Sequence, residues 1–366
     1  MTLKLVKRRI SGVAHLAAFL LLACQGLPAS PGEINQIKPG ELWLDTSGRP
    51  INAHGGGMLF FHGTYYWYGE DKTGRCWMPE CNKSWDGYRV DFTGIHCYSS
   101  QDLLHWKDDG LVLKAVVDDP TSDLHSSGVC ERPKVVFNAQ TRKFVMWMHV
   151  DSTCYDAARA GVAVADQPTG PFTYLGSVKP EGQDSRDQTL FLDKDGKAYR
   201  IYASETNHAT YISLLAEDYL KHSGKFIRIF VNDPMEAPAV FKHGGKYWLI
   251  GSHVTGWDPN PARAAVADAI WGPWTDLGNP CSGPGATNTF GAQSTYVFQV
   301  ADHPDDFIFM ADRWNKTNLP DSRYVWLPLH FTKQGIEVRW QDLWQLGHSS
   351  DSGKSAGKTT GNVSPR

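Results

Sequence analysis

The chain has 366 residues and a formal net charge of −3. A chain of this length can bury a sizeable core without disulfide or metal staples. Its first 30 residues hold four cations and no acidic residue, so the net charge of the remainder is −7; residues 348–366 hold three further cations and one aspartate, so residues 31–347 carry −9. Such an acidic chain argues against nucleic-acid binding, because phosphates are met by basic surfaces.

The N-terminal segment has the pattern of an export signal. Four Lys and Arg residues lie within the first nine positions, an apolar run follows over residues 12–23, and the first acidic residue is Glu33. This arrangement predicts a signal peptide over residues 1–30 and an exported mature protein. The apolar run is shorter than the ~20 residues of a membrane-spanning helix, and no later stretch approaches that length, so no transmembrane segment is expected.

Two processing sites remain open in this segment. Leu21-Leu22-Ala23-Cys24 resembles the lipobox of bacterial lipoproteins, which predicts a lipid anchor on Cys24. Ordinary signal-peptidase cleavage near Ala29 is the alternative and leaves no anchor. The mature protein is accordingly expected to be secreted, periplasmic or an outer-membrane lipoprotein.

Cysteine usage agrees with export but does not fix a pairing. Six cysteines follow Cys24, and an even number in an exported chain permits disulfides. Cys76 and Cys81 form the easiest local pair, although six cysteines allow 15 full pairings. No cysteine or histidine spacing suggests zinc. No organic cofactor is indicated, and a structural calcium ion stays open.

The region from residue 36 to residue 347 reads as one all-β domain. Short aromatic and β-branched runs, bounded by Gly, Pro, Asn and Asp, replace long helical patterns. Five of these runs resemble one another, each a turn followed by a strand: residues 62–70, 141–149, 195–204, 244–252 and 305–313. A second motif, a strand with a Gly-Pro-aromatic return, follows two of them, at 161–176 and 264–278.

The spacing of these runs predicts a five-bladed β-propeller. The period is roughly 50 to 80 residues, which fits four antiparallel strands per repeat with variable loops. A two-sheet sandwich also has many short strands but does not explain the recurring hairpin. Residues 348–366 are rich in Ser, Gly, Lys and Thr without aromatics, which predicts a disordered tail.

One polar residue stands just ahead of an apolar strand in each of four repeats. These residues are Glu131, Asp187, Glu236 and Gln293. A single such carboxylate more often caps a turn or pairs with a neighbouring Arg. Their repetition in register favours a shared site, because the inner strands of a propeller converge on a central pocket. Paired carboxylates in such a pocket suit glycoside hydrolysis, which needs an acid and a partner that activates water.

From residue 40 to residue 345 the chain resembles glycoside hydrolase family 43. The resemblance rests on Glu236 in Glu-Ala-Pro followed by Gly-Lys-Tyr-Trp, and on Asp187 in Arg-Asp-Gln-Thr-Leu-Phe. It implies a five-bladed propeller in which Glu236 is the general acid. Asp187 would raise the pKa of that acid and orient it. It also implies hydrolysis with inversion of configuration.

The first repeat departs from the usual family pattern. Most members carry a general-base Asp in an Asp-Pro step, but residues 52–59 here read Asn-Ala-His-Gly-Gly-Gly-Met-Leu. Together with Glu131-Arg-Pro and Gly-Ala-Gln293, this stretch resembles the exo-β-1,3-galactanase group of the family, in which a Gln replaces the base. Gln293 would then orient the water, in one version as its imidic tautomer, while Glu131 holds the sugar or assists.

Two alternatives accompany this interpretation. Gln293 could bind only a hydroxyl while Glu131 is the working base, since an ordinary amide is a very poor base. The His-Gly-Gly-Gly run is also found in lipase oxyanion loops, but no Gly-x-Ser-x-Gly nucleophile motif accompanies it. An esterase is therefore not expected.

Further substrate contacts are expected from residues near the strand ends. Aromatic faces stack on sugar rings, while carboxylates, amides and hydroxyls pair with sugar hydroxyls. For each residue a core or turn role is nearly as plausible. The candidates are Glu70, Tyr155, Asn207, Thr255, Trp257 and Arg313.

These observations favour a monomeric, exo-acting hydrolase that releases galactose from β-1,3-galactan with inversion. The partner is then a polysaccharide or oligosaccharide substrate. An α-L-arabinofuranosidase or β-xylosidase of the same family is the enzymatic alternative. A non-catalytic carbohydrate-binding propeller is the alternative from another class of protein.

Overall fold

The computed structural model describes residues 36–347. The predicted signal peptide, Cys24 and the tail 348–366 lie outside the described residues. Residues 36–347 all belong to one compact unit. None of the helices in this range has the length and hydrophobicity that crossing a membrane requires.

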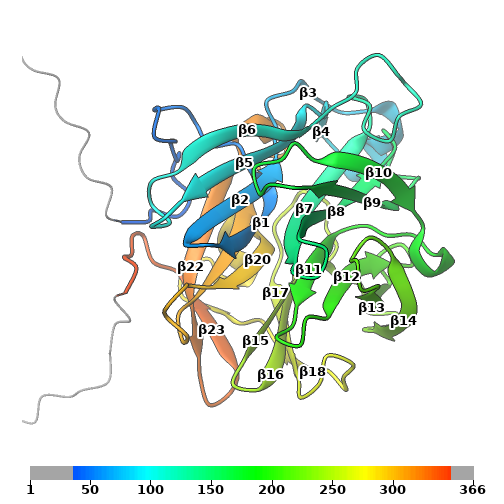
Figure 1. The fold of residues 1–366 in the computed structure, drawn as a ribbon. Coiled ribbons are helices and arrows are strands. Elements are labelled where there is room, and N and C mark those ends of the chain that lie inside the picture. The colour runs from blue at the N-terminus through cyan, green and yellow to red at the C-terminus, as the bar shows by residue number, and fades with distance from the viewer. Residues whose placement is uncertain (1–35, 348–366) are drawn as a thin grey trace, which may run out of the picture. The chain divides into compact units, whose positions relative to one another are not determined.

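Residues 36–347 form five antiparallel blades, which confirms the predicted all-β five-bladed propeller (Figure 1). Blade one has the order β1-β2-β5-β6, with β1 (His54–Phe61), β2 (Thr64–Glu70), β5 (Gly94–Ser100) and β6 (Lys107–Lys114). Blade two contains β7 (Val129–Asn138), β8 (Lys143–Asp151), β9 (Arg159–Ala165) and β10 (Thr173–Val178). Blade three contains β11 (Gln188–Leu192), β12 (Ala198–Ser204), β13 (Ala209–Leu215) and β14 (His222–Ile229).

Blades four and five complete the set. Blade four contains β15 (Glu236–His243), β16 (Lys246–Ser252), β17 (Ala262–Ala267) and β18 (Thr275–Gly278). Blade five contains β20 (Gln293–Gln299), β21 (Phe307–Arg313), β22 (Arg323–Phe331) and β23 (Ile336–Arg339), with β19 (Cys281–Ser282) parallel to β23. A small ribbon and four 3₁₀ segments lie in the connections of the described chain: β3 (Cys76–Trp77), β4 (Arg89–Val90), η1 (Glu80–Trp85), η2 (Pro180–Gly182), η3 (Ala286–Gly291) and η4 (Leu319–Asp321).

The five recurring runs are the second strands of the five blades. Each of β2, β8, β12, β16 and β21 follows the first strand of its own blade after a short connection, from residues 62–63 in blade one to residues 300–306 in blade five. These strands are buried almost along their whole length, because both faces of a blade pack against neighbouring blades. Trp67 in β2 and Trp147 in β8 are accordingly almost fully buried.

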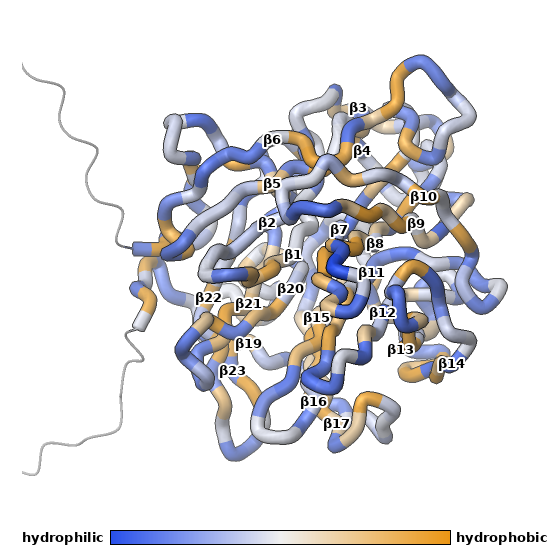
Figure 2. Tube along the Cα trace, in the orientation of Figure 1, coloured by the Kyte–Doolittle hydropathy of each residue, from blue (hydrophilic) through white to orange (hydrophobic). Residues whose placement is uncertain are grey.

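The first strands line the centre of the propeller. Strands β1, β7, β11, β15 and β20 contact one another in a closed ring. Figure 2 shows apolar stretches along strands such as β7 and β15, and hydrophilic turns at the blade ends. The start of each first strand therefore faces a common central space.

The two ends of the described chain meet beside blade five. Ile37 and Trp344 exchange two backbone hydrogen bonds, of 2.8 and 3.0 Å. The Trp344 indole also donates to the Trp326 carbonyl at 2.8 Å. Blade one and blade five come from opposite ends of the described chain. This short bridge therefore connects the N-terminal segment to the segment that follows blade five.

The structure corrects the expected local disulfide. Cys81 pairs with Cys154, 73 residues away, with the Cα atoms 5.8 Å apart. Cys76 is held in β3, where its Sγ lies 3.7 Å from the Thr317 carbonyl oxygen. Cys81 lies in η1 beside the loop that follows β8, so its nearest thiol comes from another blade. Among the described residues, the other cysteines are free: Cys76, Cys97, Cys130 and Cys281.

Candidate active site

The first strands of three blades begin with the same backbone irregularity. His54, Glu131 and Glu236 each pair with the second strand of their blade, and the register shifts directly afterwards. The next residue has a positive φ in every case: Gly55 (58°), Arg132 (55°) and Ala237 (53°). Such bulges re-aim a side chain at the end of a strand. His54 is therefore the blade-one counterpart of Glu131 and Glu236.

Close packing explains the glycines after His54. A Cβ on Gly55 would lie 2.3 Å from the Glu70 Oε1, and one on Gly56 would lie 2.3 Å from the Tyr68 carbonyl oxygen. A Cβ on Gly57 would lie 2.4 Å from the Lys134 side chain. Close packing around the start of β1 thus accounts for the run, and its resemblance to an oxyanion loop needs no catalytic explanation.

Glu236 is a largely enclosed carboxylic acid at the start of β15. Its Oε1 accepts a hydrogen bond of 2.7 Å from the Asn207 amide, and its Oε2 lies 3.4 Å from the Gln293 amide nitrogen. Burial, followed by the negative charge of Asp187, raises the pKa of Glu236 to about 8. The group therefore carries its proton in neutral solution.

Asp187 connects blade three to this acid. Its Oδ2 accepts the backbone N–H of Ala237 at 3.1 Å, so it holds the bulge next to Glu236. The same oxygen lies 3.0 Å from the Arg132 guanidinium. The ion pair keeps a negative charge beside Glu236 while Arg132 partly offsets its effect.

Gln293 is fixed by partners from three blades. Its Oε1 accepts hydrogen bonds from Arg132 Nη2 and from the Trp314 indole, the latter at 3.1 Å. Its Nε2 donates to the Ser252 hydroxyl at 3.0 Å. A carbonyl oxygen has two lone pairs, and these two donors occupy both. The side chain is therefore oriented as an ordinary amide.

Glu131 is ionised in the same pocket. Its Oε1 accepts a 2.8 Å hydrogen bond from the Tyr155 hydroxyl, and its Oε2 lies 3.7 Å from His149 Nδ1. Burial alone would raise the pKa of Glu131, but His149 and the charge of Lys72 lower it to about 2. Burial likewise opposes protonation of His149, but Asp151, at 2.8 Å, and Glu131 raise the His149 pKa to about 9.

Glu70 and Lys72 add a second buried ion pair. The Lys72 ammonium lies 2.5 Å from the Glu70 Oε2, and the other Glu70 oxygen accepts the Arg132 backbone N–H at 3.1 Å. The ammonium also lies 5.5 and 5.4 Å from the ring centres of Trp257 and Trp314. Both aromatic rings therefore lie beside the buried Glu70–Lys72 ion pair.

Of the remaining predicted substrate contacts, one lies at the site and two do not. Trp257 lies at the site, with its ring 5.1 Å from that of Trp314. Thr255 is exposed and closes a turn, donating to the Asp258 carbonyl at 2.6 Å. Arg313 faces away: its guanidinium donates to the Phe290 carbonyl at 2.7 Å and lies over Trp340. The central site thus collects Glu70, Glu131, Tyr155, Asp187, Asn207, Glu236, Trp257 and Gln293.

Three cationic residues of the site had no predicted role. Arg132 follows Glu131 directly, and His149 is the register partner of Glu131 on β8. Both could therefore have been found by pairing the predicted strands. Lys72 lies beyond the end of β2 and carries no such signal. All three supply positive charge that compensates the converging carboxylates.

One group of side chains has the spacing of a metal site. Ligand atoms of Glu131, His149 and Asp187 lie within 4.8 Å of one another. Arg132 already pairs with Asp187, and the raised pKa of His149 keeps that ring protonated. These cationic partners balance both carboxylates, so the charge of the group does not require an ion.

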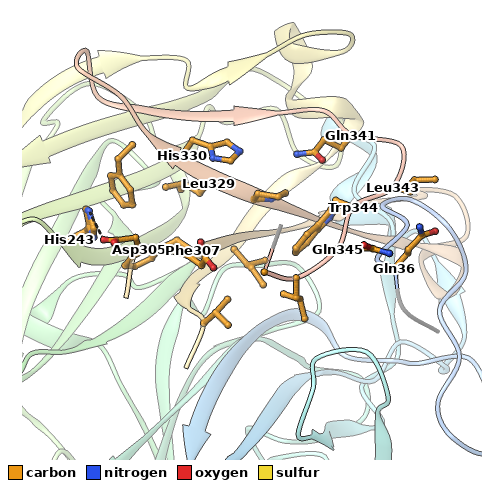
Figure 3. Close-up of a pocket in the computed structure, with 17 residues that line it drawn as sticks. Gln36, His243, Asp305, Phe307, Leu329, His330, Gln341, Leu343, Trp344 and Gln345 are labelled. Carbon is orange, nitrogen blue, oxygen red and sulfur yellow. Dashed lines mark ion pairs between the residues drawn. The ribbon is translucent and has the colours of Figure 1, made fainter. Parts of the chain in front are cut away.

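A separate hollow of ≈580 Å³ lies between blades four and five, near the C-terminal segment (Figure 3). His243, which lines it, is the last residue of β15, whereas Glu236 is the first. An eight-residue strand spans about 23 Å between its ends. The hollow therefore opens at the opposite end of the blade and is distinct from the carboxylate site.

Comparison with known proteins agrees with this geometry. Residues 62–311 match the model of glycosyl hydrolases family 43. The chain is 42% identical to a family 43 β-1,3-galactosidase crystallised with galactodeoxynojirimycin, covering 84% of this chain and all of that one, with a TM-score of 0.77. No curated protein sequence gave a match.

Two exo-β-1,3-galactanases with known structures are also similar. A variant of the enzyme from Phanerochaete chrysosporium, bound to β-1,3-galactotriose, is 36% identical over 85% of this chain and 68% of its own, with a TM-score of 0.76. The enzyme from Clostridium thermocellum is 35% identical over 84% of this chain and 66% of its own, with a TM-score of 0.73. The chain described here belongs to glycoside hydrolase family 43.

Proposed function

We propose that this protein is an exo-acting hydrolase that releases galactose from β-1,3-galactan with inversion of configuration. The observation that carries the proposal is a protonated Glu236 facing a fixed Gln293, in a pocket where blade one presents His54 in place of a carboxylate. Relatives described as β-1,3-galactosidases and exo-β-1,3-galactanases support the choice of sugar and linkage.

Glu236 acts as the general acid in this proposal. It gives its proton to the glycosidic oxygen as the bond to the sugar breaks, and the leaving sugar departs as an alcohol. Burial and the negative charge of Asp187 keep that proton in place beforehand by raising the pKa of Glu236. The Asn207 amide then stabilises the new carboxylate through its 2.7 Å hydrogen bond.

Gln293 orients the attacking water through the amide N–H that lies 3.4 Å from Glu236, and Glu131 binds the sugar. The water adds to the oxocarbenium-like carbon and then releases one proton to solvent. The partners of Gln293 favour the ordinary amide over the imidic tautomer, because Arg132 and Trp314 both donate to its oxygen. The rival assignment makes Glu131, an ionised carboxylate, the base that takes the water proton. In either case water attacks the face opposite the leaving group, which gives inversion.

The first test is product analysis. Purified mature protein is incubated with β-1,3-galactan, β-1,4-galactan, arabinan and xylan, and the released sugars are identified. We expect galactose alone, from the β-1,3-linked polymer, appearing first as the α-anomer by NMR. Arabinose or xylose would favour the other family activities, and binding without any product would favour a carbohydrate-binding propeller.

We also propose that the protein acts outside the cytoplasm. The Cys81–Cys154 disulfide supports this, because such bonds persist in oxidising compartments. Metabolic labelling with a radioactive fatty acid, compared between the natural chain and Cys24→Ser, decides whether Cys24 carries lipid.

A further inference from the structure

A segment inserted into blade one reaches three other blades. Residues 72–93, between β2 and β5, contain the β3–β4 ribbon and η1; we call them the blade-one insertion. The Cys81–Cys154 disulfide ties it to the loop after β8 in blade two. The disulfide therefore joins the blade-one insertion directly to blade two.

Two further anchors hold the insertion to blades four and five. The Trp257 indole donates to the Tyr88 carbonyl at 2.6 Å. The Lys316 ammonium lies 2.9 Å from both Asp86 and Asp258, which joins the insertion to the loops after β21 and β16. The insertion is therefore fixed at three points, beside loops that carry residues of the catalytic pocket.

Trp85 stands on this insertion between two of those loops. It is the one exposed tryptophan among residues 36–347, with 40% of its surface accessible. Its ring lies edge-on to Tyr155, with centres 5.6 Å apart. A Cβ added to Gly87 would lie 2.3 Å from the Trp85 ring and one added to Gly256 would lie 3.2 Å from it, so both glycines pack against the indole.

Contacts on both sides lead from Trp85 to the reacting groups. Tyr155 donates to Glu131. On the other side Gly256 precedes Trp257, which packs on Trp314, and Trp314 donates to Gln293. Trp85 thus belongs to an aromatic rim around a polar, charged floor.

We propose that Trp85 binds the sugar unit on the leaving-group side of the bond that is cleaved. This inference rests on the proposed function. In an exo-acting enzyme the terminal galactose occupies the polar floor, so the next galactose lies at the rim. The apolar C–H face of a pyranose stacks on an indole, and an exposed tryptophan at the mouth of a pocket offers such a face.

The test separates the two sugar positions. Trp85→Ala and Trp85→Phe are assayed with β-1,3-galactotriose, which fills both positions, and with galactodeoxynojirimycin, a single-ring inhibitor that fills one. Trp85→Ala should lower kcat/KM for galactotriose about tenfold, mainly through KM, because one stacking contact is lost. Inhibition by the iminosugar should change less than about twofold, and Trp85→Phe should restore most of the activity.

Phe226→Ala is the matched control. Phe226 is also 40% exposed, but it lies on β14 and stacks on Tyr211, away from the rim. It should change neither measurement. Unchanged kcat/KM for Trp85→Ala, with an active natural chain, overturns the inference and leaves the proposed function intact; so does an equal loss of iminosugar binding. A natural chain that does not cleave galactotriose overturns both.

Discussion

At the scale of single residues, two carboxyl groups in one pocket have opposite protonation states. Burial and Asp187 raise the pKa of Glu236 to about 8, whereas His149 and Lys72 bring that of Glu131 down to about 2. Environments that push two pKa values apart divide the roles of acid and carboxylate at one working pH. Activity requires these two glutamates to differ in protonation state, and that difference is set by the neighbouring groups, since the residue type is the same.

The pH profile should report this arrangement. Activity requires protonated Glu236, so kcat/KM should fall as the pH rises through about 8. Asp187→Asn removes a negative charge that raises this pKa, so its alkaline limb should move to lower pH. Asp193→Asn, in blade three and paired with Lys242, is the control and should leave the limb in place. An unmoved limb in Asp187→Asn contradicts the assigned role of Asp187.

Replacing the two candidates for water activation should separate them. Gln293→Asn withdraws the amide by one methylene and should lower kcat about 100-fold, as loss of a positioned group does. Glu131→Gln keeps the shape but removes the charge, and should act mainly on KM. A large loss of kcat in Glu131→Gln, with little effect of Gln293→Asn, would make Glu131 the base.

Removal of the acid is the third expectation at this scale. Glu236→Gln should lower kcat by about 10²–10⁴ while galactotriose still binds, because the amide cannot donate the required proton. Calorimetric binding and turnover on the same preparation measure both. Unchanged turnover would exclude Glu236 as the acid.

At the scale of elements, strand starts and one insertion shape the site. The bulges after His54, Glu131 and Glu236 turn these three side chains, at or near the starts of their strands, toward the centre. The blade-one insertion then depends on contacts with other blades, because its own ribbon has only two residues per strand. A two-stranded ribbon of that length is not stable alone.

The disulfide should therefore matter to both stability and binding. Cys81→Ser with Cys154→Ser should lower the free energy of unfolding by about 4 kcal/mol, since the bridge closes a long loop. It should also raise KM for galactotriose by loosening the insertion. Cys76→Ser with Cys281→Ser removes two free thiols and serves as the control in denaturant unfolding. Equal midpoints for both double variants would show that the bridge adds no stability.

At the scale of the whole molecule, the described propeller is closed where β1 packs on β20 and β21 of blade five, and contacts between the chain ends reinforce this closure. Each blade is a local stretch of chain, so neighbouring blades associate through their apolar faces. The Ile37–Trp344 bridge is one link between the first described residues and the blade-five side, beside the 2.7 Å hydrogen bond from the Gly40 N–H to the Tyr324 carbonyl in β22. Trp344 is buried, whereas its neighbour Leu343 is 51% exposed.

Trp344→Ala should test this closure. Loss of a buried tryptophan should lower the free energy of unfolding by about 3–5 kcal/mol, and the effect should appear in one cooperative transition if the ring unfolds as a unit. Leu343→Ala removes an exposed side chain from the same segment and should change little. A separate early transition in Trp344→Ala would instead mean that blade five unfolds by itself.

The amino-acid sequence by itself determined the repeat and the residues that begin the inner strands. Alternating aromatic and β-branched runs identify the second strands, because side-chain period and turn chemistry are local properties. The polar residues ahead of the first strands, such as Glu236 and Gln293, were readable for the same reason. Resemblance to a known family then supplied the chemistry that periodicity does not contain.

Only the tertiary structure decided which residues from different blades meet. Three contacts join distant stretches of chain: the Cys81–Cys154 disulfide, the hydrogen bond from Arg132 to Gln293, and the packing of the Lys72 ammonium on Trp257 and Trp314. Arg313 has a suitable residue type and position, yet it faces Phe290. These outcomes depend on how five blades are set around a common centre, and that arrangement is fixed by packing between blades, which no local pattern encodes.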